Sequence, residues 1–373
     1  MKDKFIKACA LLALPAVLIG ASACGKDVGE NKSYVLNDDD VYPAVAAAYE
    51  QESKDAITRW QNASGAEKEE VVKQVAAELF AYGCYNEEYI DKYVYFSTQT
   101  GSTDLGSKGS GNVTTQNYKL IVHEGENTPG YKYHYTMKYV NEATGTIETF
   151  KSLFQSARLR FVEDTNKLYR FEGEDIRYAE GHASDSEQPL LTCDWKTGSD
   201  WGTDDPPIVK REGAKLTLAE IEQDILEQAK GEEAVIHGNV NILADNIVKS
   251  AEIISSKVDG HAVYEVRMDL DCAVANADEA SQLMLKNANS ASECRWVEDE
   301  NGKGPVITYQ VWDNGLLKYY SIDEAWEGKI KVALLSYNGG AVSSQQVWYS
   351  YSAADTSMTE KLEMLEDAKK IKG

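Results

Sequence analysis

The clearest structural signal in the chain is the stretch Tyr131-Lys132-Tyr133-His134-Tyr135-Thr136-Met137-Lys138-Tyr139. Its odd positions carry four tyrosines and a methionine, whereas Lys132, His134 and Lys138 occupy even positions. Successive side chains of a strand point to opposite faces of a sheet. This alternation therefore predicts a long, half-buried strand in the first half of the chain.

Weaker alternations on both sides of this stretch predict further strands. They cover residues 93–98, 113–123, 146–154, 159–162 and 168–171, and later 262–271, 306–312, 316–322, 329–336 and 345–351. The connections are short and rich in turn residues, such as Asp313-Asn314-Gly315. Short connections between alternating strands favour an antiparallel meander.

Amphipathic helices are predicted before each set of strands, within the second set and at the C-terminus. The expected ranges are 43–62, with Pro43 in the first turn, 64–83, 217–230, 242–249, 276–288 and a last helix from about 357. Capping boxes are expected at Ser64 with Glu67 and at Thr217 with Glu220, and Asn276 with Glu279 is expected to cap the helix at 276–288. The order helix then strands occurs twice, so the predicted class is α+β. We expect an antiparallel sheet, either flat or strongly curved, packed by amphipathic helices.

The organisation predicted for the chain has three parts. Residues 1–23 form a signal peptide, 24–41 a flexible tether and 42–373 a globular body. The body fits either one large sheet or two halves, 42–180 and 215–373, joined by the loop 181–214. No residue-level repeat decides between these alternatives.

The first 23 residues have the three regions of a signal peptide. Lys2, Lys4 and Lys7 precede an apolar stretch over residues 8–19, and small residues then lead to Cys24. The segment Ala21-Ser22-Ala23-Cys24 resembles the lipobox of bacterial lipoproteins, in which the cysteine receives a lipid and becomes the new N-terminus. That resemblance implies lipidation of Cys24 and an extracytoplasmic, membrane-anchored protein. The family usually has leucine at the position of Ala21, and the segment also fits an ordinary signal-peptidase site, so secretion without an anchor is the alternative.

Composition excludes a nucleic-acid partner. The chain has 61 acidic and 38 basic residues and a formal charge of −23, whereas phosphate backbones are held by a surplus of Lys and Arg. No motif of a nucleotide site, a serine hydrolase or a zinc protease is present. The five histidines are scattered and the acidic clusters lack the spacing of a calcium loop. We therefore expect no enzyme activity, no cofactor and no metal; calcium binding by the acidic loops and an extracellular hydrolase, for which only the abundant carboxylates speak, are the alternatives left open.

Two sets of residues are candidates for ligand contact. The chain has 22 tyrosines against 7 phenylalanines. The tyrosines of the opening stretch either belong to the core beneath the helices or line a groove that suits an amphipathic ligand: Tyr131, Tyr133, Tyr135 and Tyr139. The second set lies in the loop 172–214, where indole rings and carboxylates suit a glycan or a protein partner: Asp194, Trp195, Asp200, Trp201, Asp204 and Asp205.

A second resemblance concerns the last hundred residues. The run Val263-Tyr264-Glu265-Val266-Arg267-Met268-Asp269-Leu270-Asp271, followed later by Tyr309-Gln310-Val311-Trp312-Asp313-Asn314-Gly315-Leu316-Leu317-Lys318, resembles lipoproteins of the LolA and LppX/LprG type. In that family a strongly bent antiparallel sheet is lidded by helices and holds acyl chains. The resemblance implies an apolar or amphipathic ligand between sheet and helices; the alternative function is a surface module acting through the loop 172–214.

The mature body would contain four cysteines, Cys84, Cys193, Cys272 and Cys294. Export permits disulfides, and four cysteines allow three connectivities. A bridge between Cys272 and Cys294 makes the least demanding closure, and all four thiols could also stay reduced.

Overall fold

The computed structural model describes residues 42–43, 45–90, 92–104, 110–122, 131–143, 156–164, 167–173, 194–197, 213–230, 245–258, 260–279, 281–282, 291–300, 302–332 and 335–351. The expected signal peptide, tether, strand at 146–154 and helix after 357 lie outside these residues.

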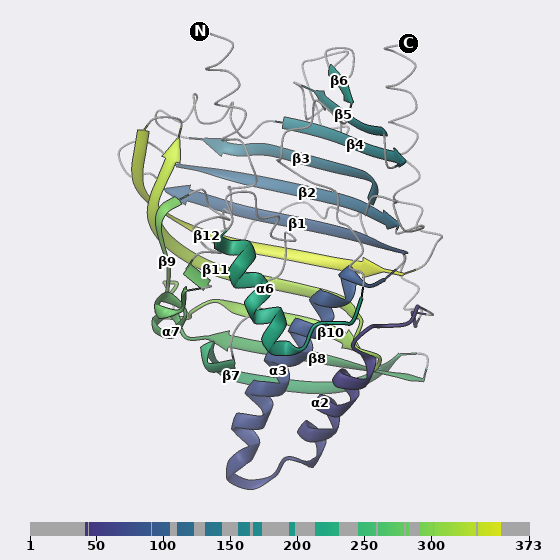
Figure 1. Ribbon diagram of the computed structural model, residues 1–373. Helices are drawn as coiled ribbons and strands as arrows, with labels where there is room; N and C mark the ends of the chain where they lie inside the picture. The colour runs from purple at the N-terminus through teal and green to yellow at the C-terminus, as the bar shows by residue number, and fades with distance from the viewer. Residues whose placement is uncertain are drawn as a thin grey trace.

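The described residues include twelve antiparallel strands, which form one sheet. Figure 1 shows how these strands are arranged. The first set is β1 (Lys92–Asp104), β2 (Ser110–Val122), β3 (Tyr131–Ala143), β4 (Ser156–Asp164), β5 (Lys167–Gly173) and β6 (Asp194–Thr197). The second set is β7 (Val248–Val258), β8 (His261–Leu270), β9 (Ala291–Val297), β10 (Val306–Trp312), β11 (Leu317–Val332) and β12 (Leu335–Ser350). Their order is β6-β5-β4-β3-β2-β1-β12-β11-β10-β8-β7, with β9 added beside β11. The predicted α+β class with an antiparallel meander is confirmed.

The two strand sets are joined by the pairing of β1 with β12. This seam runs in continuous register from Val94 opposite Ser350 to Asp104 opposite Gly340. Among the described strands the first, β1, therefore lies beside the last, β12, and both strand sets belong to one sheet.

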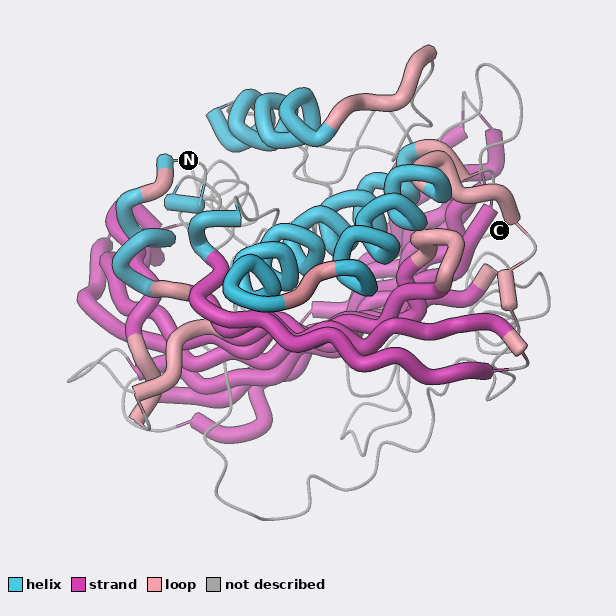
Figure 2. Tube along the Cα trace, turned by 90° about the horizontal axis from the view of Figure 1, so that it is seen from below, coloured by secondary structure: helices cyan, strands magenta, loops and turns pink. Residues whose placement is uncertain are grey.

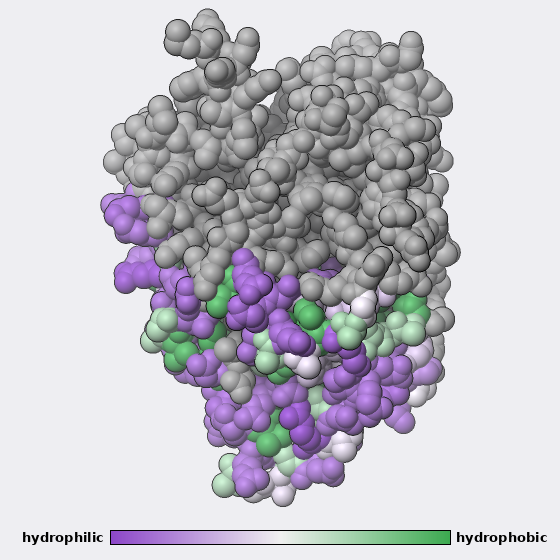
Figure 3. All heavy atoms as spheres, viewed as in Figure 1, coloured by the Kyte–Doolittle hydropathy of each residue, from purple (hydrophilic) through white to green (hydrophobic). Residues whose placement is uncertain are grey.

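The helices lie on one face of the sheet (Figure 2). Helix α2 (Glu50–Asn62) and helix α3 (Lys68–Tyr85) form a hairpin that packs over β7, β8, β10 and β11, and α6 (Leu218–Lys230) packs on α3. Short 3-10 turns cover Gly65–Glu67, Asn86–Glu88 and Asp245–Ile247, and α7 (Cys272–Ala277) follows β8. The outer surface of this region is mainly hydrophilic, with small apolar patches (Figure 3). Within the described part of the chain, no helix has the length and apolar character needed to cross a membrane.

Three expectations for the helices require correction. Helix α2 begins at Glu50 rather than at Pro43, and Ser64 makes no side-chain cap. Helix α3 does not stop at Gly83 but continues to Tyr85. Gly83 serves packing instead, because a Cβ at this position would lie 2.7 Å from Cγ of the buried Leu317. The Thr217 and Glu220 capping box is confirmed, with the Thr217 N–H donating to Glu220 Oε2 at 2.7 Å and the Glu220 N–H donating back to Thr217 Oγ1 at 3.4 Å.

The second strand set also differs from expectation. The helix predicted at 242–249 is a single 3-10 turn followed by β7, and the helix predicted at 276–288 is preceded by α7, whose N-cap is Asp271. Asn276 does not cap a helix, because its side chain bonds to the backbone of Trp296. The ranges 316–322 and 329–336 belong mainly to one long strand, β11, and β9 had no counterpart among the predicted strands.

Tyrosine and phenylalanine fill the core beneath the helix hairpin. Phe80 of α3 contacts the rings of Tyr309 and Tyr320 at centroid distances of 5.3 and 5.6 Å. The Tyr309 hydroxyl donates to the carbonyl of Ala76 at 2.6 Å, and the Tyr351 hydroxyl donates to the carbonyl of Leu317 at 2.8 Å. These phenols combine apolar area with a satisfied hydroxyl, so the sheet face under the hairpin is packed rather than hollow.

The buried side chain of Asn86 ties three elements together. The Tyr49 N–H donates to Asn86 Oδ1 at 3.1 Å, just before α2, and Asn86 Nδ2 donates to the Gly315 carbonyl at 2.9 Å in the turn between β10 and β11. Gly315 has a φ of 85°, as the predicted Asp-Asn-Gly turn requires. One amide thus fixes the helix hairpin to the sheet.

Candidate functional site

The candidate site lies at the gap between β9 and β10, two strands that both pair with β11. Strands β9 and β10 lie one after the other along the same edge of β11, with Val297 opposite Ala325 and Val306 opposite Asp323. The chain between them, residues 298–305, leaves the sheet as a loop. Glu324 is the β11 residue opposite this gap.

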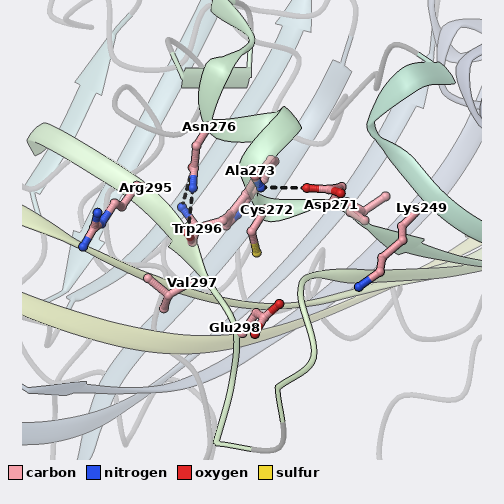
Figure 4. Close-up of a pocket in the computed structure, with 10 residues that line it drawn as sticks. Lys249, Asp271, Cys272, Ala273, Asn276, Arg295, Trp296, Val297 and Glu298 are labelled. Atoms are coloured by element: carbon pink, nitrogen blue, oxygen red, sulfur yellow. Dashed lines mark hydrogen bonds between the residues drawn. The ribbon is translucent and has the colours of Figure 1, made fainter.

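An open pocket of about 380 Å³ lies beside the interruption (Figure 4). The end of β8, helix α7, β9 and the start of β7 form it. Its lining residues are Lys249, Leu270, Asp271, Cys272, Ala273, Asn276, Arg295, Trp296, Val297 and Glu298.

Charges of both signs surround the pocket. Asp271 Oδ1 accepts hydrogen bonds from the backbone N–H groups of Ala273 and Val274 at 2.8 and 3.1 Å, so this carboxylate is used as a helix cap. Arg295 Nε donates to Glu327 Oε1 at 2.6 Å. Lys249 and Glu298 complete the charged lining (Figure 4).

The thiol of Cys272 points into this pocket from α7, toward the carboxylate of Glu298 (Figure 4). Its pKa is raised above the usual value, chiefly by burial and further by Glu298 and Asp271, with Lys249 opposing. Cys272 is a free thiol, so the bridge to Cys294 that spacing favoured is absent. A thiol whose pKa is raised is a poor nucleophile at neutral pH.

Trp296 links the pocket to a second cluster on β11. Asn276 holds its backbone in place, donating to the Trp296 carbonyl at 2.8 Å and accepting from the Trp296 N–H at 2.9 Å. The indole N–H of Trp296 donates to Glu324 Oε2 at 2.5 Å. The buried indole therefore contributes both to the pocket lining and to the environment of Glu324.

Glu324 is a carboxylate in a mainly apolar setting. Its other oxygen, Oε1, accepts from the Ser343 hydroxyl at 3.3 Å. Burial raises the pKa of Glu324, the two hydrogen bonds from Trp296 and Ser343 oppose that shift, and the nearby Asp323 adds to it. Trp326 lies directly opposite Trp296 and is 3% exposed, and its indole nitrogen finds no hydrogen-bond partner in the described part of the chain. We call Glu324, Trp296, Trp326 and Ser343 the carboxylate–indole cluster.

The residues singled out from the sequence lie elsewhere in the sheet. Tyr131, Tyr133, Tyr135 and Tyr139 are on β3, separated from β11 by β2, β1 and β12. Tyr133 is paired with Leu120 and Phe161, and Tyr135 with Tyr118 and Leu159. Asp194 and Trp195 are on the edge strand β6, opposite Glu172 and Phe171. The other four loop candidates lie outside the described residues: Asp200, Trp201, Asp204 and Asp205.

The carboxylate–indole cluster was not predicted, although the sequence contained a signal for it. On β11, Tyr320, Ile322, Glu324 and Trp326 occupy alternate positions and so belong to one face of the strand. An acidic residue inside an otherwise apolar alternation is a candidate for a buried polar site.

Metal binding finds no support in the described ranges, where no group of three or more His, Cys, Asp or Glu side chains could hold an ion. In the acidic turn at 298–302, Asp299 is committed to the backbone, accepting from the Lys303 N–H at 2.9 Å through Oδ1.

Comparison with known proteins adds little to this description. No protein-family model matches the chain, and no curated protein matches it. A DUF1329 family protein from Desulfovibrio piger, known from a crystal structure, is similar over 75% of this chain and 91% of its own length, with 10% identity and a TM-score of 0.17. A likeness at that TM-score carries no conclusion about fold or function.

Proposed function

We propose that this protein is a lipid-anchored, extracytoplasmic binding protein that holds an amphipathic ligand on the helix-facing side of its sheet and catalyses no reaction. The observation that supports this proposal most is the change from apolar to polar side chains along one face of β11. Tyr320 and Ile322 belong to the packed core, whereas Glu324, on the same face, is a half-buried carboxylate next to two indoles. Adjacent apolar and polar zones on a sheet suit a ligand with an apolar body and a polar end.

The chemistry of the pocket supports binding rather than catalysis. Its thiol, Cys272, is protonated at neutral pH, because burial and two carboxylates raise its pKa. His261 stacks on Tyr42 at the opposite end of β8 and is too far along the strand to serve as a base for Cys272. Among the described residues no histidine lies within reach of Cys272, so this thiol lacks there the imidazole that usually activates a nucleophile.

The anchor is tested by replacing the lipidation residue. We expect the wild-type protein to partition into the detergent phase of Triton X-114 extracts, and Cys24→Ala to move most of it to the aqueous phase or the medium. The reason is that the alanine variant cannot carry the diacylglycerol that holds this acidic body at the membrane. A wild-type protein that already partitions as a water-soluble one would contradict the anchor.

The ligand is tested by native mass spectrometry of protein purified from cells in a mild, exchangeable detergent. We expect wild type to carry additional mass of lipid size. Ser343→Leu should reduce that mass, because it replaces a buried hydroxyl that donates to Glu324 with a larger apolar side chain; Ser343 is 2% exposed. Ser344→Leu is the matched control, since neighbouring residues of a strand face opposite sides.

Thermal melting shows whether both leucine variants are folded. Adduct-free spectra of folded wild type and of folded Ser344→Leu would exclude the ligand. The surface-module hypothesis would then be preferred, and it has one supporting observation of its own: Asp194 and Trp195 lie on β6, the terminal strand of the sheet.

A further inference from the structure

We propose that the carboxylate of Glu324 and the indole rings of Trp296 and Trp326 form a subsite for the ammonium headgroup of an organic cation. This inference rests on the proposed function, because it assigns a headgroup to the amphipathic ligand.

The electrostatic argument begins with the missing counter-charge of Glu324. Its two oxygens accept one hydrogen bond each, from the Trp296 indole and from the Ser343 hydroxyl, and both donors are neutral. Among the described residues no lysine or arginine forms an ion pair with it, and the charged group that acts on its pKa is another acid, Asp323. A carboxylate withdrawn from water is costly unless a positive charge compensates it. A bound cation would supply that compensation.

The two indoles define what kind of cation fits. Trp296 on β9 and Trp326 on β11 are directly opposite in the strand register and are 6% and 3% exposed. Tryptophan presents the most favourable aromatic face to a cation, and quaternary or alkylated ammonium groups are recognised in this way. The indole N–H of Trp296, bonded to Glu324, fixes one ring beside the carboxylate.

Two other ligand classes fit less well. A divalent metal requires several oxygen ligands, and the described residues offer no set of three or more acidic, cysteine or histidine groups. An anionic headgroup would be repelled by Glu324 in a chain of net charge −23. A weakly hydrated organic cation satisfies both the carboxylate and the rings. Glu324 is also accessible to it, because this residue keeps partial exposure although both indoles are buried.

The test uses the mature full-length protein and three probes, with binding followed by isothermal titration and tryptophan fluorescence at constant ionic strength. The probes are tetramethylammonium, decyltrimethylammonium and neutral decyl maltoside, the last two below their micelle concentrations. We expect decyltrimethylammonium to bind at least about tenfold more tightly than decyl maltoside, and Glu324→Gln to remove that preference by a similar factor.

The matched control is Asp323→Asn, which removes the same charge one residue away on the other side of the sheet and should leave the preference unchanged. Equal binding of both decyl probes, unaffected by Glu324→Gln, would overturn the ammonium subsite and keep the amphipathic-ligand proposal. Binding of tetramethylammonium lost in Glu324→Gln, with no gain from the decyl chain, would keep the subsite and contradict the amphipathic ligand. Absence of binding by all three probes to folded protein would overturn the subsite.

Discussion

Replacement of Asn86 by leucine is expected to lower the free energy of unfolding by roughly 2 to 6 kcal/mol. The leucine side chain fills a similar volume but leaves the Tyr49 N–H and the Gly315 carbonyl without their partners. Each buried polar group left unpaired costs about 1 to 3 kcal/mol, and Asn86 itself is fully buried. Urea unfolding followed by circular dichroism measures the change.

The control for Asn86→Leu is Asn62→Leu at the exposed end of α2, which should change the free energy of unfolding by no more than about 0.5 kcal/mol. Asn86→Asp distinguishes the two hydrogen bonds, because it keeps the acceptor for Tyr49 and loses the donor to Gly315. Equal stability of Asn86→Leu and wild type would show that this amide does not hold the helix hairpin to the sheet.

Replacement of Gly328 by alanine is expected to separate β9 from β11. A Cβ at Gly328 would lie 2.0 Å from the Glu293 carbonyl oxygen and 2.9 Å from the Cys294 Cα, both of which are backbone atoms that no rotamer change can move. Overpacking of this kind costs about 3 kcal/mol or more where the backbone must shift. Trp296 lies on β9, so its indole should lose the hydrogen bond to Glu324, and tryptophan fluorescence should report the change together with the unfolding midpoint.

Gly340→Ala is the matched control for this substitution. Gly340 also lies inside a long strand, but its nearest neighbour to an added Cβ is the Trp326 carbonyl oxygen at 3.3 Å, so we expect a stability change within about 1 kcal/mol. If Gly328→Ala were as stable as Gly340→Ala and kept the native fluorescence, the close approach of β9 to β11 would be wrong.

Much of the fold was predictable because local patterns and tertiary structure agree. The strand at 306–312 was predicted with the bounds it has, and the Asp313-Asn314-Gly315 turn forms the expected hairpin. The alternation at 131–139 lies within β3. In these segments the hydrophobic period, the turn residues and the final burial all indicate the same structure.

The predictions were wrong where the role of a residue is decided by its contacts with a segment distant in sequence. Gly83 resembles a helix stop, yet its missing side chain accommodates Leu317 of β11. Strand β7 is an edge strand whose side chains are largely exposed, including Ile254 at 53%, so it lacks a buried alternation. Glu324 stands out as an acid in an apolar alternation, but its place opposite the interruption between β9 and β10 is set by strand register, which no local pattern encodes.

The seam between β1 and β12 has a consequence for how the chain reaches its native state. The seam pairs residues 94–104 with residues 340–350, and the hydrogen bond between Tyr349 and Glu87 beside it joins residues 262 positions apart. Such contacts form only after a long segment has lost its freedom, and folding slows as contacts become more distant in sequence. While the chain is synthesised from its N-terminus, one edge of β1 stays unpaired until β12 becomes available. Unpaired edges invite association with other chains, so this protein has reason to depend on chaperones until β12 has paired with β1.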